Sequence, residues 1–102
     1  MTLHIHPEAK EEADHAAVWY ELASPNLGMR FVEALQESLA RIEARPQAFA
    51  RMESYRGRYS IRRDRVEGFP YIVVFSCSPE ATVVLAIAHT SRRPMYWRGR
   101  MK

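Results

Sequence analysis

The sequence contains only one cysteine, two lysines and four glycines among its 102 residues. The single cysteine, Cys77, excludes a disulfide within the chain and offers no paired-cysteine motif for zinc or redox chemistry. The glycines are scattered, which excludes a glycine-rich loop that cradles a phosphate, and the four histidines show no recognisable ligand spacing. We therefore expect neither a cofactor nor a bound metal, and a thiol nucleophile with His89 as its base is disfavoured.

Long apolar runs are also missing from the sequence. No run approaches the length of a membrane span, and the first residues lack the basic segment and apolar stretch of a secretory signal. With 47% hydrophobic and 26% charged residues, the composition is that of a folded globular protein. We therefore expect one cytoplasmic domain over residues 1–102, without a membrane partner.

Charge is unevenly distributed along the chain. Residues 1–45 carry eight acidic and four basic side chains, whereas residues 46–102 carry four acidic and eleven basic side chains. Thirteen of the fifteen basic residues are arginine, which favours planar, bidentate contacts with phosphate or carboxylate groups. A genome that prefers arginine codons also produces an arginine excess, but it does not explain this asymmetry. The second half is expected to contact a macromolecule rather than a small-molecule substrate.

The first quarter of the chain predicts a strand followed directly by a helix. Residues 3–6 alternate apolar and polar side chains, as a strand does, and Pro7 suits the first turn of a helix. Within residues 8–23, alanines and Tyr20 recur at intervals of three and four, and acidic side chains occupy the first turns. The small alanines indicate close packing against another helix.

A second helix is expected from residue 25 to residue 45. Ser24 predicts its N-cap, Pro25 suits its first position, and Pro46 stops it. Two helices joined this tightly form an antiparallel hairpin, whose apolar side must be buried against another layer.

The second half of the chain supplies the strands of that layer. Its β-branched and aromatic runs predict a central strand and a neighbouring strand, joined by a turn that contains Cys77. The expected elements are a loop at 46–57, strands at 58–63, 69–75 and 81–88, and a short helical tail at 95–100. The expected core residues are Phe31, Leu35, Leu39, Ile42, Tyr71, Val73, Leu85 and Ile87.

The expected fold is therefore α+β: an N-terminal strand, an antiparallel helical hairpin packed on a small, mainly antiparallel sheet, and a short C-terminal helical tail. A basic, aromatic segment follows the last strand and is the strongest candidate for a contact surface, because arginine and aromatic side chains together serve phosphate and protein recognition. Trp97 is expected to anchor the core instead, as large aromatics in small domains usually do. The candidate contact residues are Arg92, Arg93, Tyr96, Arg98 and Arg100, with Arg58, Arg62 and Arg63 facing the same way from a neighbouring strand.

Several short motifs occur in the order of these elements. They are Pro7-Glu8-Ala9, Phe69-Pro70-Tyr71, Val84-Leu85-Ala86-Ile87-Ala88-His89, Arg92-Arg93-Pro94 and Tyr96-Trp97. Together with the element order, the set resembles the RelE/ParE superfamily of toxins from bacterial type II toxin–antitoxin systems, over nearly the whole chain. The resemblance implies a RelE/ParE toxin-like fold and a growth-inhibiting, plasmid-stabilising protein. It also implies a cognate antitoxin encoded nearby, whose partly disordered segment folds across the toxin.

The superfamily includes two activities. RelE-like members resemble ribosome-dependent nucleases that cut mRNA, and this branch would assign acid, base and charge-stabilising roles to His89, Tyr96, Arg62 and Arg92. However, Thr90 stands where a catalytic arginine would be expected, and the lysine-rich middle strand of that branch is missing.

ParE-like members resemble binding modules that poison DNA gyrase and contribute no catalytic residues of their own. The helical hairpin, the Phe-Pro-Tyr strand entry and the arginine-rich tail are closer to this branch, so we prefer a gyrase-binding toxin. The mRNA endoribonuclease, with ribosome and mRNA as partners, is the first alternative. A non-toxic nucleic-acid-binding accessory protein is the second, and it would show a steep salt dependence of binding.

Overall fold

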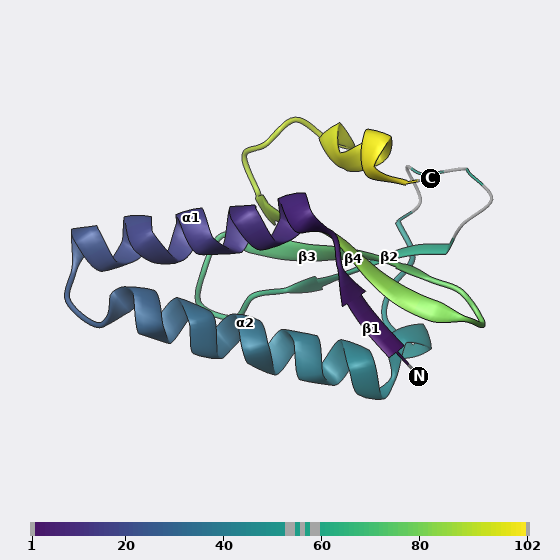
Figure 1. The fold of residues 1–102 in the computed structure, drawn as a ribbon, viewed down its shortest axis with the longest axis horizontal. Coiled ribbons are helices and arrows are strands. Elements are labelled where there is room, and N and C mark those ends of the chain that lie inside the picture. Colours follow the sequence, from purple (N-terminus) through teal and green to yellow (C-terminus); the bar gives the residue numbers. More distant parts are fainter. Residues whose placement is uncertain (1, 53–54, 56, 58–59, 102) are drawn as a thin grey trace.

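Two antiparallel helices cover one face of a four-stranded sheet, and the C-terminal segment packs against the other face (Figure 1). The architecture comes from a computed structural model, which describes residues 2–52, 55, 57 and 60–101. The described strands lie in the order β1-β4-β3-β2; β1 runs parallel to β4, and the other two pairs are antiparallel. This mainly antiparallel sheet confirms the expected α+β class. The strands are β1 (Thr2–Ile5), β2 (Ser60–Arg65), β3 (Tyr71–Cys77) and β4 (Ala81–His89).

The two helices, α1 (Pro7–Ala23) and α2 (Leu27–Ala44), form the expected hairpin. The side chain of His6 caps α1, because its Nδ1 accepts a hydrogen bond from the Glu8 N–H at 3.1 Å. The helices approach each other closely at Gly28, since a Cβ at this position would overlap the carbonyl oxygen of Ala17. The helices therefore pack closely, as the alanine pattern of α1 indicated.

The turn between the helices differs from the prediction. Ser24 is the C-cap of α1, not the N-cap of α2, because its N–H donates to the carbonyl of Tyr20. α2 begins after Asn26, whose φ of 71° lies in the left-handed region that asparagine tolerates. The Glu21 carboxylate accepts hydrogen bonds from the N–H groups of Asn26 and Gly28, both at 3.0 Å. A carboxylate on α1 thus performs the capping that the sequence pattern assigned to Ser24.

The start and end of β3 lie two residues later than predicted. Gly68 has a φ of 88°, and the turn that it permits includes Phe69, whose N–H donates to the carbonyl of Val66. The strand consequently begins at Tyr71 and continues through Cys77. Cys77 is therefore a buried strand residue rather than a turn residue.

The segment before β3 is also displaced relative to the prediction. Residues 46–57 were expected to form a loop, but Pro46–Ala48 forms a short 3-10 helix and Arg51 makes an isolated bridge to Arg62. β2 occupies Ser60–Arg65 instead of residues 58–63. Arg58 lies outside the described residues.

Apolar side chains form one cluster on each face of the sheet. The helix-side cluster contains Phe31 and Val73, and the tail-side cluster contains Leu85 and Trp97, which is only 2% exposed. Trp97 is thus a core anchor, as predicted. Six of the eight expected core residues are buried, whereas Leu39 and Tyr71 lie partly buried at the margin of the helix-side cluster. In the part of the chain that the structure describes, no helix is both long and apolar enough to cross a membrane.

Candidate functional site

The edge of β4 is only half covered by a neighbouring strand. β1 pairs with β4 as far as Val84, and the His6 N–H donates to the Val84 carbonyl at 2.8 Å, but β4 continues to His89. Near the end of this pairing, a register shift against β3 leaves Leu85 as a bulge. Among the described residues, no strand satisfies the backbone groups of this edge beyond the bulge. Such groups require other partners.

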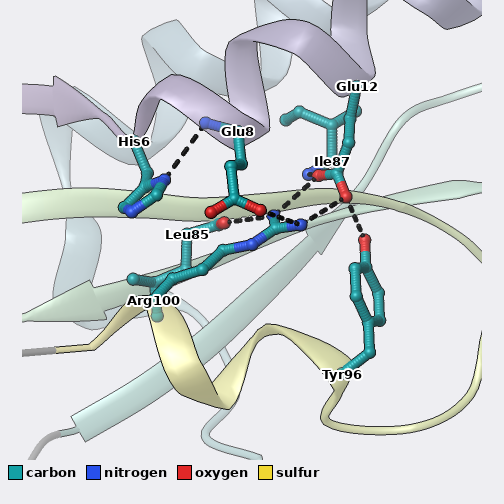
Figure 2. Close-up of polar contacts among 7 residues, drawn as sticks. All are labelled: His6, Glu8, Glu12, Leu85, Ile87, Tyr96 and Arg100. Carbon is teal, nitrogen blue, oxygen red and sulfur yellow. Dashed lines mark hydrogen bonds and ion pairs between the residues drawn. The ribbon is translucent and has the colours of Figure 1, made fainter.

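Side chains from α1 and from the C-terminal tail (residues 90–101) supply those partners (Figure 2). Arg100 Nη1 donates to the Leu85 carbonyl at 2.9 Å, and the Ile87 N–H donates to Glu12 Oε1 at 2.9 Å. The Arg100 guanidinium also donates to both Glu12 oxygens, at 3.0 and 2.9 Å. Finally, the Tyr96 hydroxyl donates to Glu12 Oε2 at 2.7 Å. One carboxylate therefore joins α1, β4 and the C-terminal 3-10 helix (Tyr96–Arg100).

These contacts fix the protonation states of the network. Burial raises the pKa of Glu12, but the hydrogen bonds from Arg100, Tyr96 and the Ile87 N–H together outweigh burial and hold that pKa below its ordinary value of 4.5. Burial, and then the bond to Glu12, raise the pKa of Tyr96 well above its ordinary value of 10.0. At neutral pH the carboxylate is therefore charged and the phenol keeps its proton.

A groove of about 490 Å³ lies beside this network, between α1 and the tail. On the α1 side it is lined by exposed Glu8, Glu11 and Trp19, and on the other side by His89 and Arg92. Glu8 pairs at 3.5 Å with the same guanidinium that Glu12 holds. Glu11 forms no ion pair with any described residue. The groove thus has an acidic wall facing a basic one.

The arginines predicted on the tail fall into two groups. Arg92, Arg93 and Arg98 are exposed, and the guanidinium of Arg92 lies 3.9 Å from the centroid of the Tyr96 ring, in a cation–π contact. By contrast, the side chain of Arg100 is only 10% exposed and is held by Glu12 and Leu85. Arg100 and Tyr96 therefore fix the tail internally, while the other three arginines face solvent.

The arginines of β2 do not face the same way, so that expectation is wrong for Arg62. Arg62 lies opposite Phe75 of the helix-side cluster, and its guanidinium donates to the Phe49 carbonyl at 2.6 Å. Arg63 lies opposite Val74 of the tail-side cluster and is exposed. The physical reason is that successive residues of a strand point to opposite faces of the sheet.

Most of the chain matches a known protein family. Residues 3–94 match the family described as "ParE toxin of type II toxin-antitoxin system, parDE". The chain belongs to the ParE toxin family. It is thus a toxin of a type II toxin–antitoxin system, and membership of the family implies an antitoxin partner. A comparison with curated proteins finds no match. Tyr96 and Arg100, which bind Glu12, lie beyond the matched range.

In this ParE-family toxin, the residues that the RelE-like alternative would use are only partly brought together. His89 and Arg92 line the same groove and Arg92 lies over the Tyr96 ring, but Arg62 faces the helix layer and the Tyr96 hydroxyl is bonded to Glu12. The Nδ1 atom of His89 accepts a hydrogen bond from the Ser91 N–H at 3.0 Å. The Nδ1 atom of His89 is thus engaged within the protein.

The toxin also exposes an apolar surface that the sequence reasoning missed. Val18, Trp19 and Leu22 of α1, here called the hairpin patch, are 59%, 66% and 83% exposed, and Met29 at the start of α2 is 62% exposed. A signal was present in the sequence, because these three residues of α1 fall outside the stripe of alanines and Tyr20 that is buried. Exposed apolar surfaces of this kind mark contact sites.

Proposed function

We propose that this toxin arrests growth by binding and poisoning DNA gyrase, and that Arg92, Arg93 and Arg98 contact the target. The observation that carries the proposal is that these three arginines are exposed on a segment that Trp97 and the Glu12 network hold in place. An anchored segment that presents several guanidinium groups suits bidentate recognition of carboxylates, because its backbone loses little freedom on binding.

The charge around the groove supports a protein target over a nucleic acid. Glu8 and Glu11 line the α1 side of the groove, opposite Arg92. A phosphate backbone lying on the tail arginines would approach these carboxylates and be repelled, whereas a protein surface with both signs of charge is complementary to both walls. Arginine and aromatic side chains, which the tail contains, are also enriched in protein–protein interfaces.

The role of the tail arginines is tested by replacing Arg92 and Arg93 together with alanine. We expect unchanged folding, because both side chains are exposed, and loss of growth arrest on induction. The matched control is the double variant Arg30→Ala, Arg45→Ala, which removes two exposed arginines, one in α2 and one at its C-cap, and should leave the arrest intact. A folded tail variant that still arrests growth would refute the assignment.

The target is tested by adding the purified toxin to gyrase with supercoiled DNA and, separately, to translating ribosomes with mRNA. The expected result is gyrase poisoning with intact mRNA. Cleaved mRNA with unaffected gyrase would favour the RelE-like alternative. His89 and Arg92, which line the same groove, would then be the candidate catalytic residues.

We further propose that the antitoxin places an amphipathic segment over the outer face of α1. The hairpin patch offers apolar area near the turn, and the acidic side chains of Glu8 and Glu11 lie toward the start of the same helix. A complementary segment would therefore carry apolar residues toward the turn of the hairpin and basic residues toward the N-terminus of α1.

A further inference from the structure

Glu12 links the three chain segments that meet at the open edge of β4. It belongs to α1, the Ile87 N–H that it accepts belongs to β4, and Tyr96 and Arg100 belong to the tail. Its carboxylate accepts four hydrogen bonds, which is about the full capacity of its two oxygens. With side chains 17% and 10% exposed, Glu12 and Arg100 meet largely away from water.

The pair takes the place that a neighbouring strand would occupy. A strand that continued β1 would offer donors and acceptors to the backbone of β4 beyond Val84. Arg100 instead donates to the Leu85 carbonyl and Glu12 accepts from the Ile87 N–H, so one donor and one acceptor come from side chains (Figure 2). The tail is consequently attached to the sheet through polar bonds as well as through Trp97.

The attachment extends to an exposed arginine. The Tyr96 ring is fixed by its hydroxyl, which donates to Glu12, and its face lies beneath the guanidinium of Arg92 at 3.9 Å. A movement of the phenol would therefore move the support of Arg92.

We propose that Glu12 is a positioning residue that holds the tail against the open edge of β4 and thereby directs Arg92 toward the target. The effect on the target rests on the function proposed above, whereas the effect on the tail does not. Residues 95–101 lie beyond the range that defines the family match, so the match itself does not include this attachment.

The attachment is tested with the purified full chain carrying Glu12→Gln, which keeps the size of the side chain but removes its charge. Amide hydrogen exchange over residues 96–101 should become at least about tenfold faster, and the tail should remain less protected than β3, because the tail can open locally whereas the amides of β3 exchange by global unfolding. Glu11→Gln is the matched control, since Glu11 is exposed on the same helix and has no ion pair with any described residue. Equal exchange of the tail in the two variants would overturn the proposal.

A second variant keeps the test decisive if Glu12→Gln does not fold. Tyr96→Phe removes only the hydroxyl that donates to Glu12 and leaves the two Arg100 bonds in place. It should speed exchange of the tail in the same direction but by a smaller factor. A Tyr96→Phe tail that exchanges as slowly as the wild type would count against the attachment.

The consequence for the target is tested by a double-mutant cycle on growth arrest. If Glu12 acts through the tail, Glu12→Gln should weaken the arrest, and combining it with Arg92→Ala, which alone should weaken the arrest only in part, should cost less than the sum of the two separate losses. Independent, additive losses, or full arrest despite a loosened tail, would overturn the positioning role. If the pair of Arg92 and Arg93 proves dispensable, the proposed contact surface fails, but the exchange result is still interpretable because it involves no target.

Discussion

At the scale of the residue, Glu12 accepts four hydrogen bonds that connect α1 with β4 and the tail. The bonds that it accepts come from residues 75, 84 and 88 positions away in the chain. Breaking such a pair leaves the Arg100 guanidinium, which is 10% exposed, with only the exposed Glu8 carboxylate at 3.5 Å as a counter-ion. Single substitutions at this position should therefore be far more costly than at its neighbours.

The pH dependence of stability should report this carboxylate. The pKa of Glu12 lies lower in the folded than in the unfolded state, so its stabilisation is complete above the ordinary value of 4.5 and is lost as the pH falls through the lowered folded value. The charged and titratable groups around it are Arg100, Tyr96, Tyr71 and, through Arg100, Glu8. At pH 7, Glu12→Gln should reduce the free energy of unfolding by about 3 kcal/mol.

Urea unfolding of the wild type and of Glu12→Gln across the acid range measures this difference. The difference should shrink as the pH falls, because the wild type loses the same charge by protonation. A difference that stays constant into the acid range would show that the carboxylate charge does not contribute.

The role of a residue could be predicted from the sequence only where the size or type of its side chain determines that role. Trp97 was expected in the core because of its size, and it is buried. Arg100 was expected to contact a partner because it lies among other arginines, yet its carboxylate partner is 88 positions away and no local pattern indicates such a pair. The network of Glu12 therefore required the fold to be known.

At the scale of the element, the close approach of α1 and α2 depends on Gly28. A Cβ there would overlap the carbonyl oxygen of Ala17 and lie 2.9 Å from Glu21 Cβ, so the helices would have to separate. Gly28→Ala should lower the free energy of unfolding by about 1 to 3 kcal/mol, as overpacking does.

Gly99→Ala is the matched comparison for that substitution. Gly99 has no atom within 4 Å of the position of an added Cβ, so the change in stability should stay within about 0.5 kcal/mol. Urea unfolding of the two variants checks both values. Equal destabilisation would show that the contact between the helices is more compliant than its geometry indicates.

The existence and order of the elements could be predicted, but their ends could not. The spacing of apolar residues decides whether a segment forms a helix or a strand, and that signal was strong in α2 and in β3. The ends depend on individual hydrogen bonds instead. Ser24 has the chemistry of an N-cap, yet Glu21 reaches across the turn and caps α2, so the helix begins at Leu27.

At the scale of the whole molecule, the hairpin patch and the tail arginines lie on different parts of an elongated molecule. Its principal extents are 42, 28 and 21 Å, and the turn of the helical hairpin lies at one end of the longest axis, away from the tail (Figure 1). An antitoxin segment on the outer face of α1 would be anchored at the patch and would reach the groove through Glu8 and Glu11, whereas the target requires the tail arginines. Neutralisation by an antitoxin and contact with a target should be separable by mutation.

The double variant Val18→Ser, Leu22→Ser tests this separation. Both side chains are more than half exposed, so folding and growth arrest should persist, whereas neutralisation by the co-expressed antitoxin should weaken. The tail variant Arg92→Ala, Arg93→Ala should show the opposite behaviour, with lost arrest and preserved antitoxin binding. Full neutralisation of the patch variant would place the antitoxin elsewhere.

The bond network around β4 also has a consequence for the synthesis of the toxin. β1 and the two helices precede β4 in the chain, the residues of β4 that pair with β1 begin at Ala81, and Arg100, which covers the remaining edge, follows later still. A nascent chain can form the helical hairpin early, whereas the sheet cannot incorporate β1, nor the tail take its position, until β4 and Arg100 have been made. The surface assigned to the target is therefore assembled after the helical hairpin, so products of translation that stops before the tail lack it.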